Sequence, residues 1–69
     1  GSAVMLNRAA RVFNQLVIDG FEIDDRDDLL PAMAEALANG RNEGEIRKII
    51  AEILEDGGSP RKIRRALLR

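Results

Sequence analysis

Five basic side chains lie within residues 59–69, and no acidic residue lies among them. Lysine and arginine neutralise phosphate groups, and arginine can also donate a pair of hydrogen bonds to guanine in the major groove of DNA. A nucleic-acid surface is therefore the first chemistry that the sequence raises. Its candidate residues are Arg61, Lys62, Arg64, Arg65 and Arg69.

The same segment also fits the solvated face of a short helix. Ile63, Ala66 and Leu67 have the i, i+3, i+4 spacing of a buried stripe, so the five cations are expected to spread over the remaining arc without forming one ridge. Apart from its capping serine, the segment has no Asn, Gln, Ser or Thr to contact base edges. The net charge of −1 gives no long-range attraction to a polyanion. We therefore do not expect this helix to read DNA, and DNA binding is the alternative.

The residue types needed for nucleophilic catalysis of the serine or cysteine type are missing. The chain contains no His, Cys, Tyr or Thr, and Ser59 is its only serine besides Ser2. Ser59 precedes a proline and has no imidazole to activate it, so we interpret it as a helix N-cap. Gly57-Gly58 lacks the spacing and the lysine of a phosphate-binding loop. We predict no enzymatic activity, no catalytic residue and no cofactor.

A run of acidic residues, from Asp24 to Asp28, raises the question of a calcium site. An EF-hand loop needs carboxylates at alternating positions, with a glycine and a later glutamate at fixed places. Here the acids are adjacent, Arg26 interrupts them, and no glycine follows within the run. We predict no metal site. The carboxylates are expected to cap the next helix and to favour the positive end of its dipole.

The element that carries the basic residues follows a well-marked helix. Asn42 and Glu45 have the spacing of a capping box, and isoleucines then recur at helical spacing. Gly57-Gly58 is expected to end this helix, because glycine enters the left-handed conformation at no steric cost. Ser59-Pro60 is expected to begin the next helix, with serine as the N-cap and proline in the first turn.

The first half of the chain predicts two further helices. Residues 3–19 are apolar over a wide arc, so we expect this helix at the centre of the bundle with two neighbours. Residues 28–39 predict the second helix, but Pro31 leaves its start open. Proline is tolerated in a first turn and disfavours the helical conformation of the residue before it. The helix begins either at Asp27 or Asp28, or near Pro31 after a short turn.

Together these segments predict an all-α fold, a small compact bundle of four helices near residues 3–19, 28–39, 43–56 and 60–69. The last two helices are expected to form a helical hairpin with a Gly-Gly turn. No segment shows the period-two alternation of apolar and polar residues that is typical of a β-strand. Gly1-Ser2 is interpreted as a tag remnant, and residues 3–69 as one helical-bundle domain. The predicted core consists of Leu6, Phe13, Leu16, Val17, Leu29, Leu30, Met33, Leu37, Ile46, Ile49, Ile50, Ile53, Ile63 and Leu67.

Composition limits how such a chain can be stabilised. It has 69 residues and no cysteine, so no disulfide can support it. A domain of this size buries only about 60% of its unfolded surface. Efficient helix packing or self-association, for example as a homodimer, is expected to supply the rest. No apolar run approaches the ~20 residues of a membrane span, so we expect a soluble protein, cytoplasmic if natural and recombinant otherwise.

Part of the basic half is similar to the helix-turn-helix of bacterial repressors. That family has an alanine in the first helix, a glycine in the turn, and an isoleucine or valine and a leucine in the recognition helix. Ala51, Gly57, Ile63 and Leu67 match these positions. Glu55-Asp56 makes the turn longer than in the family, which would change the angle between the helices. The resemblance implies DNA binding through the basic last helix.

Residues 43–54 also resemble the last helix of the albumin-binding modules of bacterial surface proteins. The preceding helix lacks the aromatic residues of that family, so no binding residue is carried over.

We predict a non-catalytic helical-bundle scaffold or interaction module. Its regular caps also raise the hypothesis of a designed (de novo) protein with no biochemical activity beyond folding. The alternative is a DNA-binding helix-turn-helix module.

Overall fold

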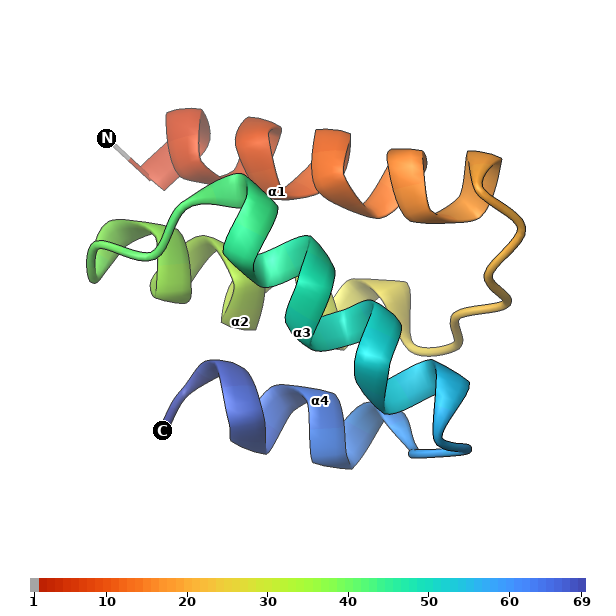
Figure 1. Cartoon of the computed structure of the whole chain (residues 1–69). Coiled ribbons are helices and arrows are strands. Elements are labelled where there is room, and N and C mark those ends of the chain that lie inside the picture. The colour runs from red at the N-terminus through yellow and green to blue at the C-terminus, as the bar shows by residue number, and fades with distance from the viewer. Residues whose placement is uncertain (1) are drawn as a thin grey trace.

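Four α-helices make up the part of the chain that the structure, a computed structural model, describes: residues 2–69 (Figure 1). They are α1 (Ser2–Ile18), α2 (Arg26–Ala38), α3 (Glu43–Glu55) and α4 (Pro60–Leu67). The predicted all-α four-helix bundle is confirmed. Of the predicted tag remnant, Gly1 lies outside the described residues, and Ser2 is the first residue of α1. The helix predicted for residues 60–69 ends earlier, at Leu67.

The first three helices end in the same way. Gly20, Gly40 and Gly57 each have a positive φ, at 99°, 103° and 77°. After α3, the N–H of Gly57 donates to the carbonyl of Leu54 and that of Gly58 to the carbonyl of Ile53, at 3.0 and 2.8 Å. This hydrogen-bond pair is a Schellman motif, and α1 and α2 end with the same pair. The predicted end of the third helix at Gly57-Gly58 is confirmed.

The starts of α3 and α4 also follow the prediction. The side chain of Asn42 accepts a hydrogen bond from the backbone N–H of Glu45 at 2.7 Å, and Ser59 accepts one from Lys62 at 3.4 Å. α3 and α4 then form a hairpin around the Gly57-Gly58 turn, as predicted (Figure 1). Local capping chemistry is therefore sufficient to place these boundaries.

The start of α2 differs from the prediction in one respect. The helix begins at Arg26, and its N-cap residue Asp25 has a left-handed backbone with φ 60° and makes no side-chain capping bond. The expectation that this carboxylate caps free N–H groups is wrong. The backbone carbonyl of Asp25 instead accepts from the N–H groups of Asp28 and Leu29. Asp27 and Asp28 occupy the first turn, where carboxylates favour the helix dipole.

Pro31 lies inside α2, which excludes the alternative in which the helix starts near Pro31. Proline has no N–H to donate to the carbonyl of Asp27, one turn earlier. Both Pro31 and Asp27 are exposed, so water can hydrogen bond to that carbonyl. The proline is thus accommodated on the wet side of the helix.

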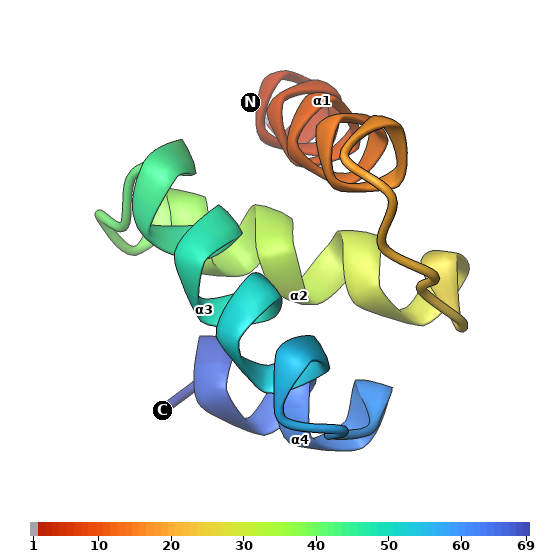
Figure 2. The ribbon, with the colours of Figure 1, turned by 45° about the vertical axis from the view of Figure 1, so that its right-hand side comes forward.

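The centre of the bundle is α2, so the first helix has the two neighbours predicted for it but does not occupy the predicted central position. Within residues 2–69, α2 and α3 each contact all three other helices, whereas α1 contacts α2 and α3, and α2 contributes more buried side chains than any other helix (Figure 2). Three small side chains of α2, Ala32, Ala34 and Ala36, are buried along with its larger ones. Alanine at several positions around a helix lets neighbouring backbones approach from more than one side.

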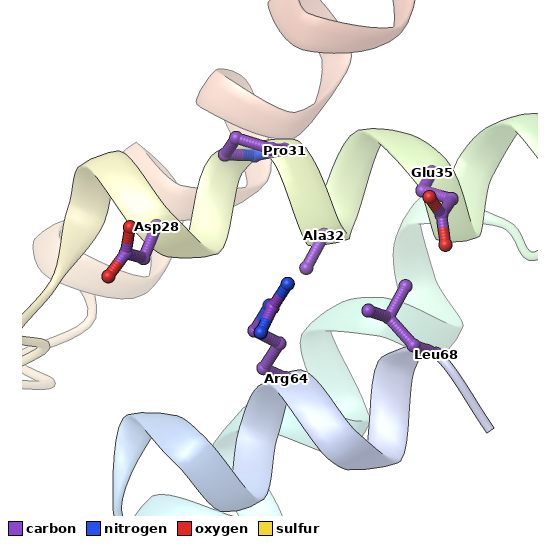
Figure 3. A pocket seen from close by; sticks show the side chains of 6 residues that line it. All are labelled: Asp28, Pro31, Ala32, Glu35, Arg64 and Leu68. Atoms are coloured by element: carbon purple, nitrogen blue, oxygen red, sulfur yellow. The ribbon is translucent and has the colours of Figure 1, made fainter.

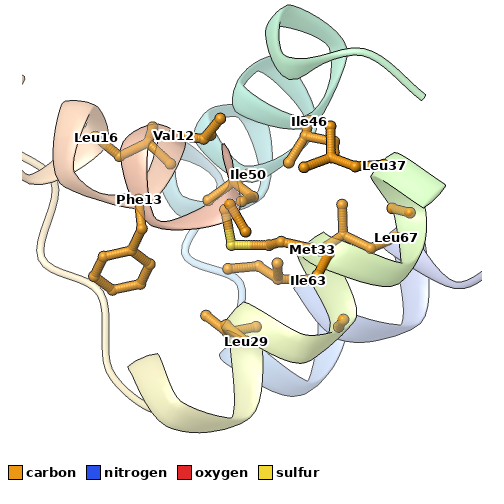
Figure 4. Packing of buried hydrophobic residues seen from close by; sticks show 14 residues of the cluster. Val12, Phe13, Leu16, Leu29, Met33, Leu37, Ile46, Ile50, Ile63 and Leu67 are labelled. Carbon is orange, nitrogen blue, oxygen red and sulfur yellow. The ribbon is translucent and has the colours of Figure 1, made fainter. Parts of the chain in front are cut away.

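The core is apolar throughout the described residues (Figure 4). Nine predicted core residues are buried, among them Met33 and Ile50, both with no exposed area. Two predictions are wrong, because Leu6 is 40% and Val17 50% exposed. Leu30, Ile49 and Ile53 are only partly buried and pack against the core. The buried residues absent from the predicted core are Ala9, Val12, Ala32, Ala34 and Ala36.

Candidate functional site

Three of the five candidate basic residues share one surface on α4. Arg61, Arg64 and Arg65 line an open hollow of about 420 Å³ together with Leu68. Their spacing of i, i+3, i+4 and i+7 places them on one face of the helix. We call this set the arginine face. Lys62 and Arg69 do not line this hollow. The five cations together therefore form no common ridge, but Arg61, Arg64 and Arg65 share one face.

Two buried side chains on the opposite side of α4 hold the arginine face toward solvent. Ile63 has no exposed area and Leu67 is 2% exposed, so the opposite side of α4 is held against the rest of the bundle. Arg61, Arg64 and Arg65 are all exposed. α4 is short, and its orientation therefore depends on these two apolar side chains.

Carboxylates of α2 lie close to one edge of the arginine face. A hollow of about 340 Å³ between α2 and α4 is lined by Asp28, Glu35, Arg64 and Leu68, with Pro31 and Ala32 at its base. Figure 3 shows the Arg64 side chain directed toward α2, between Asp28 and Glu35. Asp25 and Asp28 share a further hollow with Arg61 and Arg64. These carboxylates reduce the positive potential at that edge.

None of the ion pairs found among residues 2–69 involves α4. They join Arg8 to Glu43, Arg26 to Asp27, Arg41 to Glu45 and Arg47 to Asp19. The arginine face therefore borders carboxylates without being locked to them. Its guanidinium groups can reorient toward an anionic partner, while the neighbouring acids oppose the approach of a polyanion.

The ionisable group with a shifted pKa lies on the other side of the molecule. Hydrogen bonds from Arg47, and then from Gln15, lower the pKa of Asp19 below its ordinary value, although desolvation opposes them. The Gln15 bond is 3.0 Å long and stays within one helical turn, whereas Arg47 reaches Asp19 from α3. Arg8 and Glu43 add a second link between α1 and α3, at 3.6 Å. These contacts orient α1 against α3.

The described residues include no buried polar or charged side chain. They also include no group of three or more metal-binding side chains placed to hold a metal ion. No helix in this part of the chain combines the length and apolar character that a membrane span requires. The surfaces that stand out among the described residues are the arginine face and the exposed apolar side chains of α1.

Comparison of the chain with protein-family models, with curated proteins and with solved structures gives no match. The resemblance to a helix-turn-helix therefore depends on the residues themselves. Gly57 has the left-handed conformation of a turn glycine, and Ile63 and Leu67 anchor the last helix. Ala51 is partly buried, and residues 56–59 separate α3 from α4.

Proposed function

We propose that the chain is a non-catalytic helical scaffold that acts by associating with protein chains through its helix surfaces. The observation that supports this proposal most is the apolar surface of α1. Val4, Leu6, Val17 and Ile18 are between 40% and 75% exposed. Leu6 and Val17 fall on one side of the helix and Val4 and Ile18 on another, and exposed apolar side chains that share a surface are typical of interaction sites. The sequence has no histidine or cysteine, so it lacks the side chains for serine- or cysteine-type nucleophilic catalysis, which is consistent with a non-catalytic role.

Self-association tests this proposal directly, because the chain itself is a partner of known identity. Sedimentation velocity would be measured on the unmodified chain from about 10 μM to 1 mM, a range that detects weak interfaces. We expect the weight-average sedimentation coefficient to rise with concentration. A chain that stays monomeric throughout, with NMR chemical shifts independent of concentration, would contradict the proposal.

The regularity of the caps supports a narrower version of the scaffold proposal, in which the chain is a designed protein that only folds. Three glycine-ended helices and two side-chain N-caps agree with deliberate placement. Pro31 inside α2 and the left-handed Asp25 before it are less regular. Unusual thermal stability would favour the designed origin.

DNA binding is the second candidate, and the arginine face is the observation that favours it. Arg61, Arg64 and Arg65 lie together, exposed and outside any ion pair found among residues 2–69. The neighbouring carboxylates Asp28 and Glu35 count against it, because they repel phosphate. We rank it below the scaffold for this reason.

Fluorescence anisotropy with a mixed-sequence duplex tests the second candidate at about 150 mM salt, where weak polyanion attraction is screened. The scaffold proposal predicts a dissociation constant for the duplex that is no lower than about 10 μM. Sub-micromolar binding that Arg64→Ala and Arg65→Ala abolish would reverse the ranking. Lys62→Ala is the matched control, because it removes a cation of the same helix that lies outside the arginine face.

A further inference from the structure

The hollow of the arginine face is formed by the last helix alone. Its lining residues are three arginines and Leu68, all from α4 and its C-cap position. The carboxylates of α2 line two other hollows, which lie between α2 and α4 at the edge of this face. The arginine face therefore presents three positive charges around a hollow that no carboxylate lines.

The three guanidinium groups are not used in ion pairs within residues 2–69. None of the ion pairs there involves Arg61, Arg64 or Arg65, although carboxylates of α2 lie nearby. Ile63 and Leu67 bury the opposite side of α4, so the face keeps its direction without such pairs. Guanidinium groups held together on one side of a helix attract carboxylates or phosphates that approach from solvent.

The extent of the face distinguishes a nucleic acid from an acidic protein segment. α4 has eight residues and is about 12 Å long. A duplex carries one negative charge about every 1.7 Å and extends well beyond such a helix, so its phosphates would also approach Asp28 and Glu35. A partner helix is about 10–12 Å across and can lie along α4 alone. Repulsion from the carboxylates of α2 therefore disfavours the duplex more than the helix.

The spacing of the face matches that of an acidic helix. Arg61 lies one turn before Arg64 and Arg65. Carboxylates at i and i+3 or i+4 of a partner helix have the same separation, about 5–6 Å between Cβ atoms. Leu68, one turn further on, is 38% exposed and can contact an apolar side chain of the partner. An acidic helix that also carries an apolar residue complements both the charges and the leucine, whereas phosphate groups complement only the charges.

We propose that the arginine face binds an acidic helical segment of another protein, with carboxylates against the arginines and an apolar side chain against Leu68. This inference rests on the scaffold proposal and names the chemistry of its partner. Exposed ion pairs each contribute little, so three of them with one apolar contact give a weak complex. We expect a dissociation constant of about 0.1–1 mM at low salt, and we expect it to rise as salt screens the charges.

An NMR titration of the isotope-labelled, unmodified chain detects weak binding and locates it. The probe is an alanine-based peptide of about 20 residues, long enough to form a helix. It carries glutamates at i, i+3, i+4 and i+7 and a leucine one turn beyond each end, so that it can bind in either direction. At about 50 mM salt it should shift the amide resonances of residues 60–69 in a saturable way. The same peptide with glutamine in place of glutamate is the control, and equal binding of the two peptides would overturn the proposal.

A matched pair of charge reversals tests whether the face itself is the site. Arg61→Glu and Lys62→Glu change the net charge equally and lie side by side in the first turn of α4, but only Arg61 lines the hollow. Arg61→Glu should raise the dissociation constant at least about fivefold, and Lys62→Glu about twofold. Circular dichroism shows whether each variant is folded. If Arg61→Glu unfolds, Arg65→Gln carries the test with a rise of about threefold. Equal effects at the two positions would refute the proposed site.

The remaining outcomes separate this inference from the proposals above. A duplex that binds more tightly than about 10 μM at about 150 mM salt, and loses that binding in Arg61→Glu, makes the face a nucleic-acid site and overturns the inference. A chain that self-associates but does not bind the acidic peptide also overturns it and leaves the scaffold proposal standing. A monomeric chain that binds the peptide through Arg61 supports the inference while failing the self-association test.

Discussion

The turn between α3 and α4 provides the sharpest test of how the sequence holds this fold. A Cβ atom added at Gly58 would lie 2.4 Å from Cγ2 of Ile53 and 2.9 Å from its carbonyl oxygen. That oxygen is not free to move, because it accepts the Gly58 N–H bond at 2.8 Å. Both contacts are shorter than 3.0 Å, so Gly58→Ala forces both the Ile53 side chain and the hydrogen bond out of place.

The magnitude follows from these two contacts. Weakening the hydrogen bond costs about 1 kcal/mol, and driving a β-branched side chain off its rotamer costs about 0.5–1.5 kcal/mol. Replacing glycine also lowers the entropy of the unfolded chain, which offsets about 0.4–1 kcal/mol. We expect Gly58→Ala to lower the free energy of unfolding by about 1–2 kcal/mol. For a domain of this size the melting temperature should fall by about 5–15 °C.

Urea and thermal unfolding followed by circular dichroism measure this effect. Gly57→Ala should also destabilise, for a different reason, because φ of 77° is strained for a residue with a Cβ atom. Gly44→Ala is the matched control. Its added Cβ would meet Oδ1 of Asn42 at an ordinary 3.5 Å within α3, so it should stabilise by about 0.5–1 kcal/mol. A Gly58→Ala variant as stable as the unmodified chain would refute the reasoning.

Three further predictions concern the core, the ion pairs and the origin of the chain. In urea unfolding, Ile50→Ala should lower the free energy of unfolding by about 2–5 kcal/mol, whereas Ile18→Ala, at an exposed position, should hardly change it. Equal effects of the two variants would show that Ile50 is not part of the core. Because the pKa of Asp19 is lowered in the folded chain, its ionised carboxylate adds to the free energy of unfolding at pH 7. This contribution is lost as pH falls through the folded pKa, which lies below the ordinary value of an aspartate. The stability gap between the unmodified chain and Asp19→Asn should therefore shrink on acidification, and a constant gap would contradict this. A melting temperature above about 90 °C is expected if the chain is designed, and one near 45–65 °C would weigh against design.

The helix boundaries could be predicted because they depend on neighbouring residues. Asn42, Ser59 and the glycines act within one turn of the chain, and their hydrogen bonds are those that the sequence pattern implies. Asp25 is the exception, since its backbone is left-handed and its side chain makes no capping bond, whereas Asn42 and Ser59 have extended backbones and side-chain caps. Sequence pattern does not distinguish these two ways of starting a helix.

The rotation of α1 could not be predicted from its own residues. Its apolar arc is wide enough that several orientations bury a similar number of side chains, so Leu6 and Val17 were assigned to the core. Its orientation depends on long-range packing of Ala9, Val12, Phe13 and Leu16 against the other helices, and surface ion pairs from Arg8 to Glu43 and from Asp19 to Arg47 accompany that packing. The central place of α2 was missed for a related reason, because its buried alanines contribute little to an apolar pattern and matter through their small size.

The arginine face illustrates a signal that was present in the sequence and given too little weight. Arg61, Arg64, Arg65 and Leu68 recur at i, i+3, i+4 and i+7, the same spacing that identifies a buried stripe. The five cations together spread over a wide arc, so the shared surface is found only when Arg61, Arg64 and Arg65 are considered apart from Lys62 and Arg69. Its proximity to Asp28 and Glu35 depends on the packing of α4 against α2 and required the structure.

The position of α2 has a consequence for how the molecule comes apart. Because α1, α3 and α4 all pack on α2, no helix can detach without exposing part of the same apolar core to water. Opening any one of these three helices therefore weakens the packing of the other two on α2, and the bundle should unfold as a single cooperative unit. Amide protons of α2 would then exchange with solvent only when the whole chain unfolds, at the rate set by its global stability.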